Sequence, residues 1–361
     1  MKKLRVAIIG QGRSGRGIHG EYFKRDSSKE CYEVVAVVDA IDHRRARAAE
    51  EYGCDVYATY QELFSRNDID LVVNSTISHM HKDITIDLLN HGFNVVCEKP
   101  VCRTVEELDE MIAAAEKNGK YFNIFQQSRL APYFLKIKEI LASGNLGEIL
   151  EVDIQFNGFS RRWDWQTLQC CNGGSLYNTG PHPLDQALNI LNDYDNMPTV
   201  LCKMARAQTF GDAEDFVKLI LTAPGKPIID LSISSCDAYP LFTYKIHGSR
   251  GGLMGKISDF SWKYYKEEEA PEQKLIREPL QTEDGLPAYC GEELPFIEEH
   301  FESDSSSPFT VAVDNYYAMT YDAIVNGVEP EIKPYQVRQQ IAVIEECHRQ
   351  NPFDRLPGYE K

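Results

Sequence analysis

The stretch LRVAIIGQGRSG, residues 4–15, joins a short apolar run to three glycines spaced as G-x-G-x-x-G. An apolar run followed by this spacing, and then by a helical pattern, is typical of the first unit of a dinucleotide-binding sheet. Gly10 permits the tight turn, Gly12 lets a pyrophosphate approach the backbone, and Gly15 brings the helix close to the strand. The spacing alone is weak evidence, and its place directly after the first strand strengthens it.

The next apolar run, residues 33–38, ends at Asp39. A carboxylate at the tip of the second strand accepts hydrogen bonds from the adenosine ribose and repels a 2′-phosphate, so we expect NAD as the cofactor. Arg44 and Arg45 follow shortly afterwards. They either tolerate NADP or are exposed charges on the next helix.

Strand and helix patterns alternate as far as residue 126 and predict an N-terminal domain over residues 1–126. Six strands separated by helices are typical of an α/β, doubly wound parallel Rossmann sheet. The clearest helix begins after Thr104, which forms a capping-box pattern with Glu107, and ends at Gly119. The expected strands lie at residues 4–9, 33–38, 56–57, 70–76, 93–97 and 121–126.

The fifth of these runs continues into Glu98-Lys99-Pro100. Proline has no N–H to donate and therefore ends the strand. Ligands of parallel sheets gather at the carboxyl ends of the strands, so we expect Glu98 and Lys99 to lie at the end of a bound cofactor. A lysine there can move a proton. The alternative is an ion pair that only closes the strand.

Small polar residues at the tip of the fourth strand, Ser75 and Thr76, leave room for a ribose or a nicotinamide. His79 and His81 follow at a helix start, and without a nearby Cys or carboxylate we assign His81 to the cofactor edge rather than to a metal. The expected cofactor-binding residues are Gly10, Gln11, Gly12, Arg13, Ser14, Gly15, Asp39, Ser75, Thr76, His81, Glu98 and Lys99.

The pattern changes after residue 126 and predicts a second domain over residues 127–361, which binds substrate and mediates oligomer contacts. Longer strand-like runs with one helix at 183–191 indicate an α+β domain with a large open, mainly antiparallel sheet. Residues 264–308 are rich in Glu, Pro and Ser and are expected to form an arm. The expected strands are 148–156, 199–208, 215–222, 227–235 and 242–248, and the final helices are 309–325 and 334–347.

The segment GGSLYNTGPHPLD, residues 173–185, is the second dense group of candidate residues. Asn178, His182 and Asp185 recur at i, i+4 and i+7, which is one face if the segment is helical. A histidine beside a carboxylate removes a proton from a hydroxyl near neutral pH. The alternative is a hydrogen-bonded core histidine next to a helix charge.

The order of these motifs resembles the Gfo/Idh/MocA oxidoreductase family over essentially the whole chain, including Arg129 after the sixth strand and the run at 143–149. The resemblance implies a Rossmann domain, a C-terminal α/β domain and NAD(P)-dependent oxidation of a sugar, polyol or similar hydroxyl. It also implies that Lys99 polarises the reacting oxygen, that His182 is the acid/base, and that Asp185 binds a neighbouring hydroxyl.

One position departs from the family pattern. Sugar and inositol dehydrogenases of the family often have Asp four residues before the histidine, where this chain has Asn178. An amide can orient a substrate but cannot accept a proton. We therefore expect His182 to work with Lys99 or Asp185, and we count Lys99, His182 and Asn178 as the catalytic residues.

The segment NGFSRRWDW, residues 157–165, is dense in aromatic and cationic side chains. Trp faces stack on sugar rings, and Arg and Asp bind hydroxyls, which favours a glycoside or a bulky aglycone. Alternatively, Trp163 and Trp165 are packing or subunit-interface residues. The expected substrate-binding residues are Lys99, Arg129, Asn157, Arg161, Trp163, Asn178, His182 and Asp185.

Bulk properties narrow the class of protein. A net charge of −17 argues against binding nucleic acid or an anionic membrane. Ten cysteines without a C-x-x-C pair indicate reduced thiols in a cytoplasmic protein, and the spacing around Cys170 and Cys171 does not fit a zinc site, so no metal is expected. The N-terminus has no signal-like segment. An open sheet needs its outer face covered, which favours a homo-oligomer.

Taken together, the sequence predicts an NAD-dependent oxidoreductase that transfers a hydride between NAD and a secondary hydroxyl of a sugar, glycoside or polyol. One alternative is an enzyme that retains NAD and uses transient oxidation to cleave or eliminate a glycoside. Another is a non-catalytic NAD-sensing regulatory protein.

Overall fold

The first apolar run forms β1 (Leu4–Ile9) in this computed structural model, which describes residues 2–303 and 307–359. It belongs to a six-stranded sheet of order β3-β2-β1-β4-β5-β6 in which every pair is parallel. The remaining strands are β2 (Tyr32–Val38), β3 (Asp55–Tyr57), β4 (Leu71–Asn74), β5 (Asn94–Cys97) and β6 (Phe122–Ile124). The predicted Rossmann-type sheet is confirmed.

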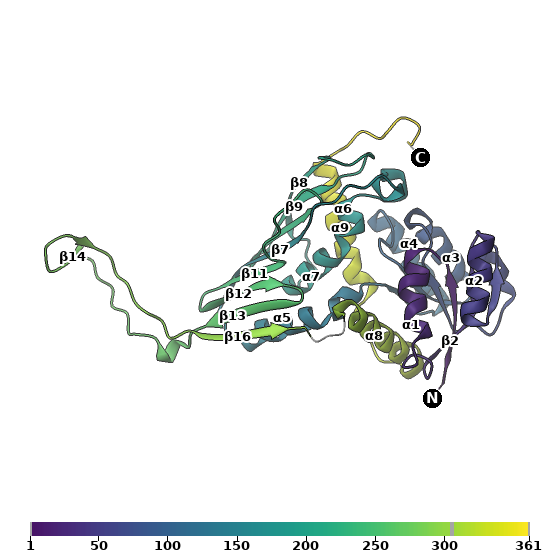
Figure 1. The fold of residues 1–361 in the computed structure, drawn as a ribbon, viewed down its shortest axis with the longest axis horizontal. Helices are drawn as coiled ribbons and strands as arrows, with labels where there is room; N and C mark the ends of the chain where they lie inside the picture. Colours follow the sequence, from purple (N-terminus) through teal and green to yellow (C-terminus); the bar gives the residue numbers. More distant parts are fainter. Residues whose placement is uncertain (1, 304–306, 360–361) are drawn as a thin grey trace.

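Helices connect these strands and cover the sheet (Figure 1). After the glycine turn the chain forms a π-helical segment (Gly15–Gly20) that runs into α1 (Glu21–Lys24). The others are α2 (Asp42–Tyr52), α3 (His81–Asn90) and α4 (Val105–Asn118). Thr104 and Glu107 form the predicted capping box of α4. Between β3 and β4 the chain forms a short 3₁₀ helix (Tyr60–Ser65).

The second half is built on an eight-stranded sheet of order β16-β13-β12-β11-β7-β10-β9-β8. Only the β7–β10 pair is parallel, so the sheet is mainly antiparallel, as predicted. The strands are β7 (Ile149–Asn157), β8 (Thr199–Ala205), β9 (Phe216–Thr222), β10 (Ile228–Ser234), β11 (Tyr244–Gly248), β12 (Gly251–Lys256), β13 (Asp259–Tyr264) and β16 (Ile297–Glu302).

Sequence patterns miss β12, β13 and β16. β12 is rich in glycine, which weakens any strand pattern. A Cβ on Gly251 would lie 2.2 Å from the carbonyl oxygen of Lys263, so neighbouring backbone occupies that space. β16 reads as mostly charged, and its Phe301 stacks on Phe260 of β13 with ring centroids 4.8 Å apart. Tertiary contacts, rather than local pattern, therefore hold this edge of the sheet.

Helices cover the face of the large sheet that is turned toward the Rossmann sheet (Figure 1). They are α5 (Pro132–Ser143), α6 (Ser175–Asn178), α7 (Pro181–Leu191) and α9 (Pro334–Gln350). Core residues such as Leu219 and Leu231 are fully buried on this face. The opposite face mixes charged side chains with exposed Leu201, Ile228 and Met254.

Between β13 and β16 the chain leaves the body as a long arm, residues 265–296, seen at the left of Figure 1. The arm carries a small hairpin of β14 (Leu280–Gln281) and β15 (Pro287–Ala288). The arm expected at 264–308 therefore ends earlier, because residues 297–302 return to the sheet as β16. Residues 304–306 of that expected arm lie outside the described part of the chain.

The helix α8 (Pro308–Tyr321), which continues into a π-helical segment (Asp322–Asn326), packs against the Rossmann half. Tyr317 stacks on Tyr22 with ring centroids 4.4 Å apart, and its carbonyl accepts a hydrogen bond of 2.6 Å from the Tyr32 hydroxyl. Aromatic packing thus ties a late segment of the chain to an early one. The division of the chain at residue 126 stays a prediction. Within the described residues, no helix has the length and apolar character needed to cross a membrane.

Candidate active site

The turn after β1 has the shape of a phosphate-binding loop. Gly10 has a φ of +90°, and a Cβ added there would lie 2.5 Å from the carbonyl oxygen of Ser75. A Cβ on Gly15 would lie 1.8 Å from the carbonyl oxygen of Gly10, so the helix packs directly on the turn. Gly12, in contrast, has open space where a Cβ would be. The backbone at Gly12 is therefore accessible to a pyrophosphate group.

Asp39 follows β2 and is buried. Its carboxylate accepts hydrogen bonds from the backbone N–H groups of Gln11, at 2.7 Å, and Ile41, at 2.9 Å. Arg44 Nη1 lies 3.5 Å from the same carboxylate, whereas Arg45 donates to the Asp39 carbonyl at 2.6 Å. The Asp39 carboxylate is therefore held in place at the end of β2. In folds of this type, a carboxylate at that position binds the ribose hydroxyls of NAD.

Ser75 and His81, which were expected to contact the cofactor, bind backbone carbonyl groups instead. The buried Ser75 hydroxyl donates to the Ile9 carbonyl at 2.7 Å, while Thr76 is partly exposed. His81 is buried, with Nδ1 2.8 Å from the Pro100 carbonyl oxygen and Nε2 3.1 Å from that of Thr76. Burial lowers the pKa of His81. The His81 ring therefore links the backbone after β4 to the Glu-Lys-Pro turn. Its two nitrogens are used by the carbonyl groups of Pro100 and Thr76.

Glu98 is buried directly after β5. Its Oε1 accepts a hydrogen bond of 3.1 Å from His19 Nε2, and its Oε2 accepts one of 3.0 Å from the Lys99 backbone N–H. His19 Nδ1 lies 2.6 Å from the Tyr317 hydroxyl. Burial opposes ionisation of Glu98, but the bond to His19 and the charge of Lys99 outweigh it and lower the pKa of Glu98 to about 2. An ionised carboxylate therefore lies beneath Lys99.

The Lys99 side chain reaches across to the second half of the molecule. Its Nζ donates to the backbone carbonyl of Asn178, at the end of α6, at 2.6 Å. Burial lowers the pKa of Lys99, Glu98 opposes this, and the nearby charges of Arg13 and Arg162 lower it further. The Asn178 side chain is used separately, because its Oδ1 accepts a bond of 3.2 Å from Gln166.

His182 lies in the first turn of α7 with Nδ1 3.1 Å from the Ser128 hydroxyl oxygen. Burial and the nearby Lys99 ammonium lower the pKa of His182 to about 3, so its ring is neutral near neutral pH. In the part of the chain that the structure describes, its Nε2 has no hydrogen-bond partner. Lys99 and His182, one from each half of the chain, therefore lie close enough for the Lys99 charge to act on the ring, and one imidazole nitrogen is available.

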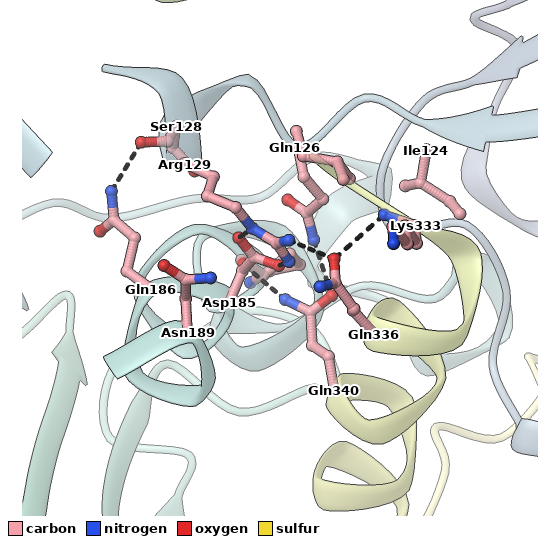
Figure 2. Close-up of polar contacts among 12 residues, drawn as sticks. Ile124, Gln126, Ser128, Arg129, Asp185, Gln186, Asn189, Lys333, Gln336 and Gln340 are labelled. Carbon is pink, nitrogen blue, oxygen red and sulfur yellow. Dashed lines mark hydrogen bonds and ion pairs between the residues drawn. The ribbon is translucent and has the colours of Figure 1, made fainter. Parts of the chain in front are cut away.

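Asp185 and Arg129 were expected at the substrate, but in the structure they bind each other (Figure 2). The guanidinium donates from Nε at 2.9 Å and from Nη2 at 2.5 Å to the two oxygens of Asp185. Arg129 also donates to the side chain of Gln336 on α9. Both charged groups are fully buried. The structure thus differs from the expectation that they bind substrate, and Asp185 pairs with Arg129 rather than with His182.

The physical reason is the direction in which α7 packs. The segment 173–185 is divided into two helices, since α6 ends at Asn178 and α7 begins at Pro181, and Thr179 and Gly180 between them keep right-handed helical dihedral angles. On α7, Asp185 is turned into the core, where the 3₁₀ helix Gln127–Leu130 places Arg129 opposite it.

The segment 157–165 is only partly at the site. Asn157 ends β7 and donates to Asp237 at 3.1 Å. Arg161 and Trp163 are exposed, and Trp163 keeps 78% of its surface accessible. Arg162, which the sequence patterns did not single out, is the arginine of this segment whose charge lowers the pKa of Lys99.

Three further residues escaped the sequence analysis: His19 beneath Glu98, Ser128 beside His182, and Gln166 beside Asn178. None lies in a motif with its partner, because tertiary packing brings each pair together. Among these three residues, only His19 carries a local signal, which is its place on the helical segment that follows the glycine turn. No group of three or more His, Cys, Asp or Glu residues within the described ranges could hold a metal ion.

Two family models match the chain. Residues 4–125 match an oxidoreductase family with an NAD-binding Rossmann fold, and residues 134–254 match a GFO/IDH/MocA C-terminal domain. The chain belongs to the Gfo/Idh/MocA oxidoreductase family. Residues 4–125 therefore form an NAD-binding domain, and the open backbone at Gly12 together with the fixed Asp39 carboxylate fits that cofactor.

Other members of the family differ in the reactions their names describe. The chain is 25% identical over 98% of its length, and 96% of the relative's, to 2,7-anhydro-N-acetylneuraminate hydratase of Mediterraneibacter gnavus. It is 27% identical over 57% of its length, and 55% of the relative's, to scyllo-inositol 2-dehydrogenase (NADP(+)) IolW of Bacillus subtilis.

The fold also matches solved structures. The WlbA dehydrogenase from Chromobactrium violaceum, solved in complex with NADH and UDP-GlcNAcA, has a TM-score of 0.73 at 17% identity. The match covers 99% of this chain and 97% of that one. At this identity the likeness shows a shared fold alone.

Proposed function

We propose that this protein is an NAD-dependent dehydrogenase that acts on a secondary hydroxyl of a sugar, glycoside or polyol. The observation that supports this most is the effect of the Lys99 charge on the His182 ring. The Lys99 ammonium is bonded to the Asn178 carbonyl at 2.6 Å and lies close enough to His182 to lower its pKa. A cation and a neutral base side by side suit a hydroxyl that loses its proton.

The glycine turn and the Asp39 carboxylate would hold NAD, which would supply the acceptor for a hydride from the carbon that bears the hydroxyl. An ammonium group has three N–H donors, and the Asn178 carbonyl uses one of those of Lys99. The remaining donors bind the substrate oxygen and stabilise the negative charge that develops on it. His182, held by Ser128 at Nδ1, accepts the hydroxyl proton at Nε2. Arg162 and Trp163 lie on the segment that we expect to contact the rest of the substrate.

The second candidate is an enzyme that retains NAD and uses transient oxidation to eliminate or cleave a sugar derivative. The alignment with 2,7-anhydro-N-acetylneuraminate hydratase over 98% of the chain favours it. The same residues would serve, because Lys99 would again bind the oxygen of a hydroxyl and His182 would again accept its proton. The two candidates differ in whether NADH leaves the protein.

A screen of NADH formation over sugars, inositols and glycosides tests the first candidate, with absorbance at the NADH band as the readout. Net NADH with one of these compounds supports the dehydrogenase. Substrate conversion without net NADH, together with NAD that copurifies, supports the second candidate. NAD binding without conversion of any compound would contradict both and favour a sensor.

A further inference from the structure

Glu214, two residues before β9, carries a buried carboxylate that the proposed reaction does not use. Its Oε1 accepts a hydrogen bond of 2.8 Å from the backbone N–H of Leu176 in α6. Its Oε2 is buried and has no hydrogen-bond partner among the described residues. A buried carboxylate with an unpartnered oxygen costs folding free energy.

The carboxylate lies directly against the turn that begins α6. Gly174 has a φ of +109°, and a Cβ there would lie 2.5 Å from each oxygen of the Glu214 carboxylate. The Ser175 N–H donates to the backbone carbonyl of Glu214 at 2.9 Å. Glu214 therefore holds this turn with both its side chain and its backbone, and only a glycine fits between them.

The same turn holds the catalytic candidate Lys99. The Asn178 N–H donates to the Gly174 carbonyl at 2.8 Å, which closes the single turn of α6. The Asn178 carbonyl then accepts the bond of 2.6 Å from Lys99 Nζ. A continuous set of contacts thus runs from Glu214 through α6 to the lysine ammonium.

We propose that Glu214 is a positioning residue, whose carboxylate fixes α6 so that the Asn178 carbonyl holds the Lys99 ammonium in place. Its effect on turnover rests on the proposed function of Lys99. The positioning itself does not, and it is testable without a substrate.

Burial raises the pKa of Glu214 to about 7, and the adjacent Asp215 carboxylate adds to the rise. Two other titratable groups act at this position. Burial raises the pKa of Tyr177 on α6, and a thiol hydrogen bond raises that of Cys347 on α9, so both stay neutral. As the pH rises through the pKa of Glu214, its bond to Leu176 becomes charge-assisted and stronger. The hold on Lys99 should tighten over the same range.

The first measurement is trace acetylation of the full-length protein with acetic anhydride, with the Lys99 peptide quantified by mass spectrometry. We compare the wild type with Glu214→Gln from about pH 6 to about pH 8, on either side of the Glu214 titration. The wild-type rate at Lys99 should show a step in this range in addition to the titration of the lysine itself. The amide variant should lack the step, and exposed Lys117 serves as the internal reference.

The second measurement is hydrogen exchange of the peptide over residues 174–180. In Glu214→Ala the Leu176 amide should exchange on the order of 10-fold faster, because it loses a hydrogen bond to a charged group. Glu214→Gln should restore most of the protection, since its carbonyl can still accept that bond. Gly174→Ala, which leaves Glu214 in place, should lose protection because its methyl group displaces the carboxylate.

Loss of the acetylation step in Glu214→Gln, with protection kept, supports the proposal even if no polyol is ever oxidised. Faster exchange in Glu214→Ala with wild-type Lys99 acetylation in every variant would make Glu214 purely structural and overturn it. If Glu214→Ala does not fold, the comparison of wild type with Glu214→Gln decides, and a step that persists in Glu214→Gln overturns the proposal.

Discussion

At the scale of single residues, the charge state of each group follows from its burial and its neighbours. Glu98 stays ionised in the core because His19 donates to it, and it in turn favours the charged form of Lys99. His182 is neutral because burial and Lys99 both disfavour its cation. An ammonium beside a neutral imidazole is the pairing that the proposed proton transfer needs.

Cofactor choice is the first prediction at this scale. We expect NAD(H) to bind more tightly than NADP(H), because the Asp39 carboxylate is fixed at the ribose position by two backbone N–H groups. Asp39→Ala should weaken NAD binding by roughly 10-fold or more, as expected for lost charge-assisted hydrogen bonds. Fluorescence titration of both cofactors measures this. Asp42→Ala, which removes an exposed carboxylate nearby, is the matched control, and tighter wild-type binding of NADP(H) would contradict the prediction.

The second prediction concerns stability and pH. Glu214 has a folded pKa of about 7 against an ordinary value of 4.5. Between these values only the unfolded chain is ionised, so folding stability should fall as the pH rises through this window and then level off. The full effect is at most about 3.5 kcal/mol, from about 1.4 kcal/mol per pKa unit.

Glu214→Gln lacks this titration. The melting temperature of the variant minus that of the wild type should therefore increase from about pH 4.5 to about pH 7 and stay constant above it. Differential scanning fluorimetry measures the difference, with Glu283→Gln in the exposed arm as the control. A difference that is constant with pH would show that Glu214 is not protonated in the fold.

At the scale of elements, prediction succeeds where a strand is buried on both faces. β1, β2, β4 and β5 read as continuous apolar runs because helices cover both sides of the parallel sheet. The sequence does not predict β12 or β16, because β12 is rich in glycine and β16 is mostly charged. The pattern of residues 173–185 predicts a single face if the segment is helical, whereas the structure divides it into α6 and α7, with Thr179 and Gly180 between them.

This difference leads to a third prediction, about the contact between α7 and the 3₁₀ helix at Gln127–Leu130. Asp185→Asn leaves the Arg129 charge buried without its partner, which costs about 3–5 kcal/mol. Chemical denaturation measures the loss. Asp109→Asn, which breaks the half-exposed pair with Arg338, should cost under about 1 kcal/mol. Equal, small losses for both variants would contradict a buried structural role for Asp185.

At the scale of the whole molecule, the candidate site lies where the two halves meet. The motifs located the glycine loop, Lys99 and His182, because each carries its signal within a few residues of sequence. They did not locate His19, Ser128 or Arg162, whose positions depend on how the halves pack. Nor did they show that α8 returns to the Rossmann half through Tyr317.

An oligomer is the prediction at this scale. The outer face of the large sheet exposes Leu201, Ile228 and Met254, and the arm exposes Leu275 and Tyr289. Apolar side chains left in water favour association. Light scattering should give a mass that is a multiple of the 41.1 kDa chain. A monomer mass at working concentrations would contradict it.

The central claim is that Lys99 acts on the reacting oxygen, and Lys99→Met tests it because the variant keeps the length of the side chain and loses its charge. Once a substrate is in hand, kcat should fall on the order of 100- to 1000-fold, the usual cost of losing a group that stabilises charge in the transition state. NAD affinity should stay near that of the wild type, and Lys117→Met, on the exposed side of α4, should change neither quantity. A folded Lys99→Met protein that binds NAD and turns over at the wild-type rate would contradict the account and leave Lys99 as a structural donor to the Asn178 carbonyl.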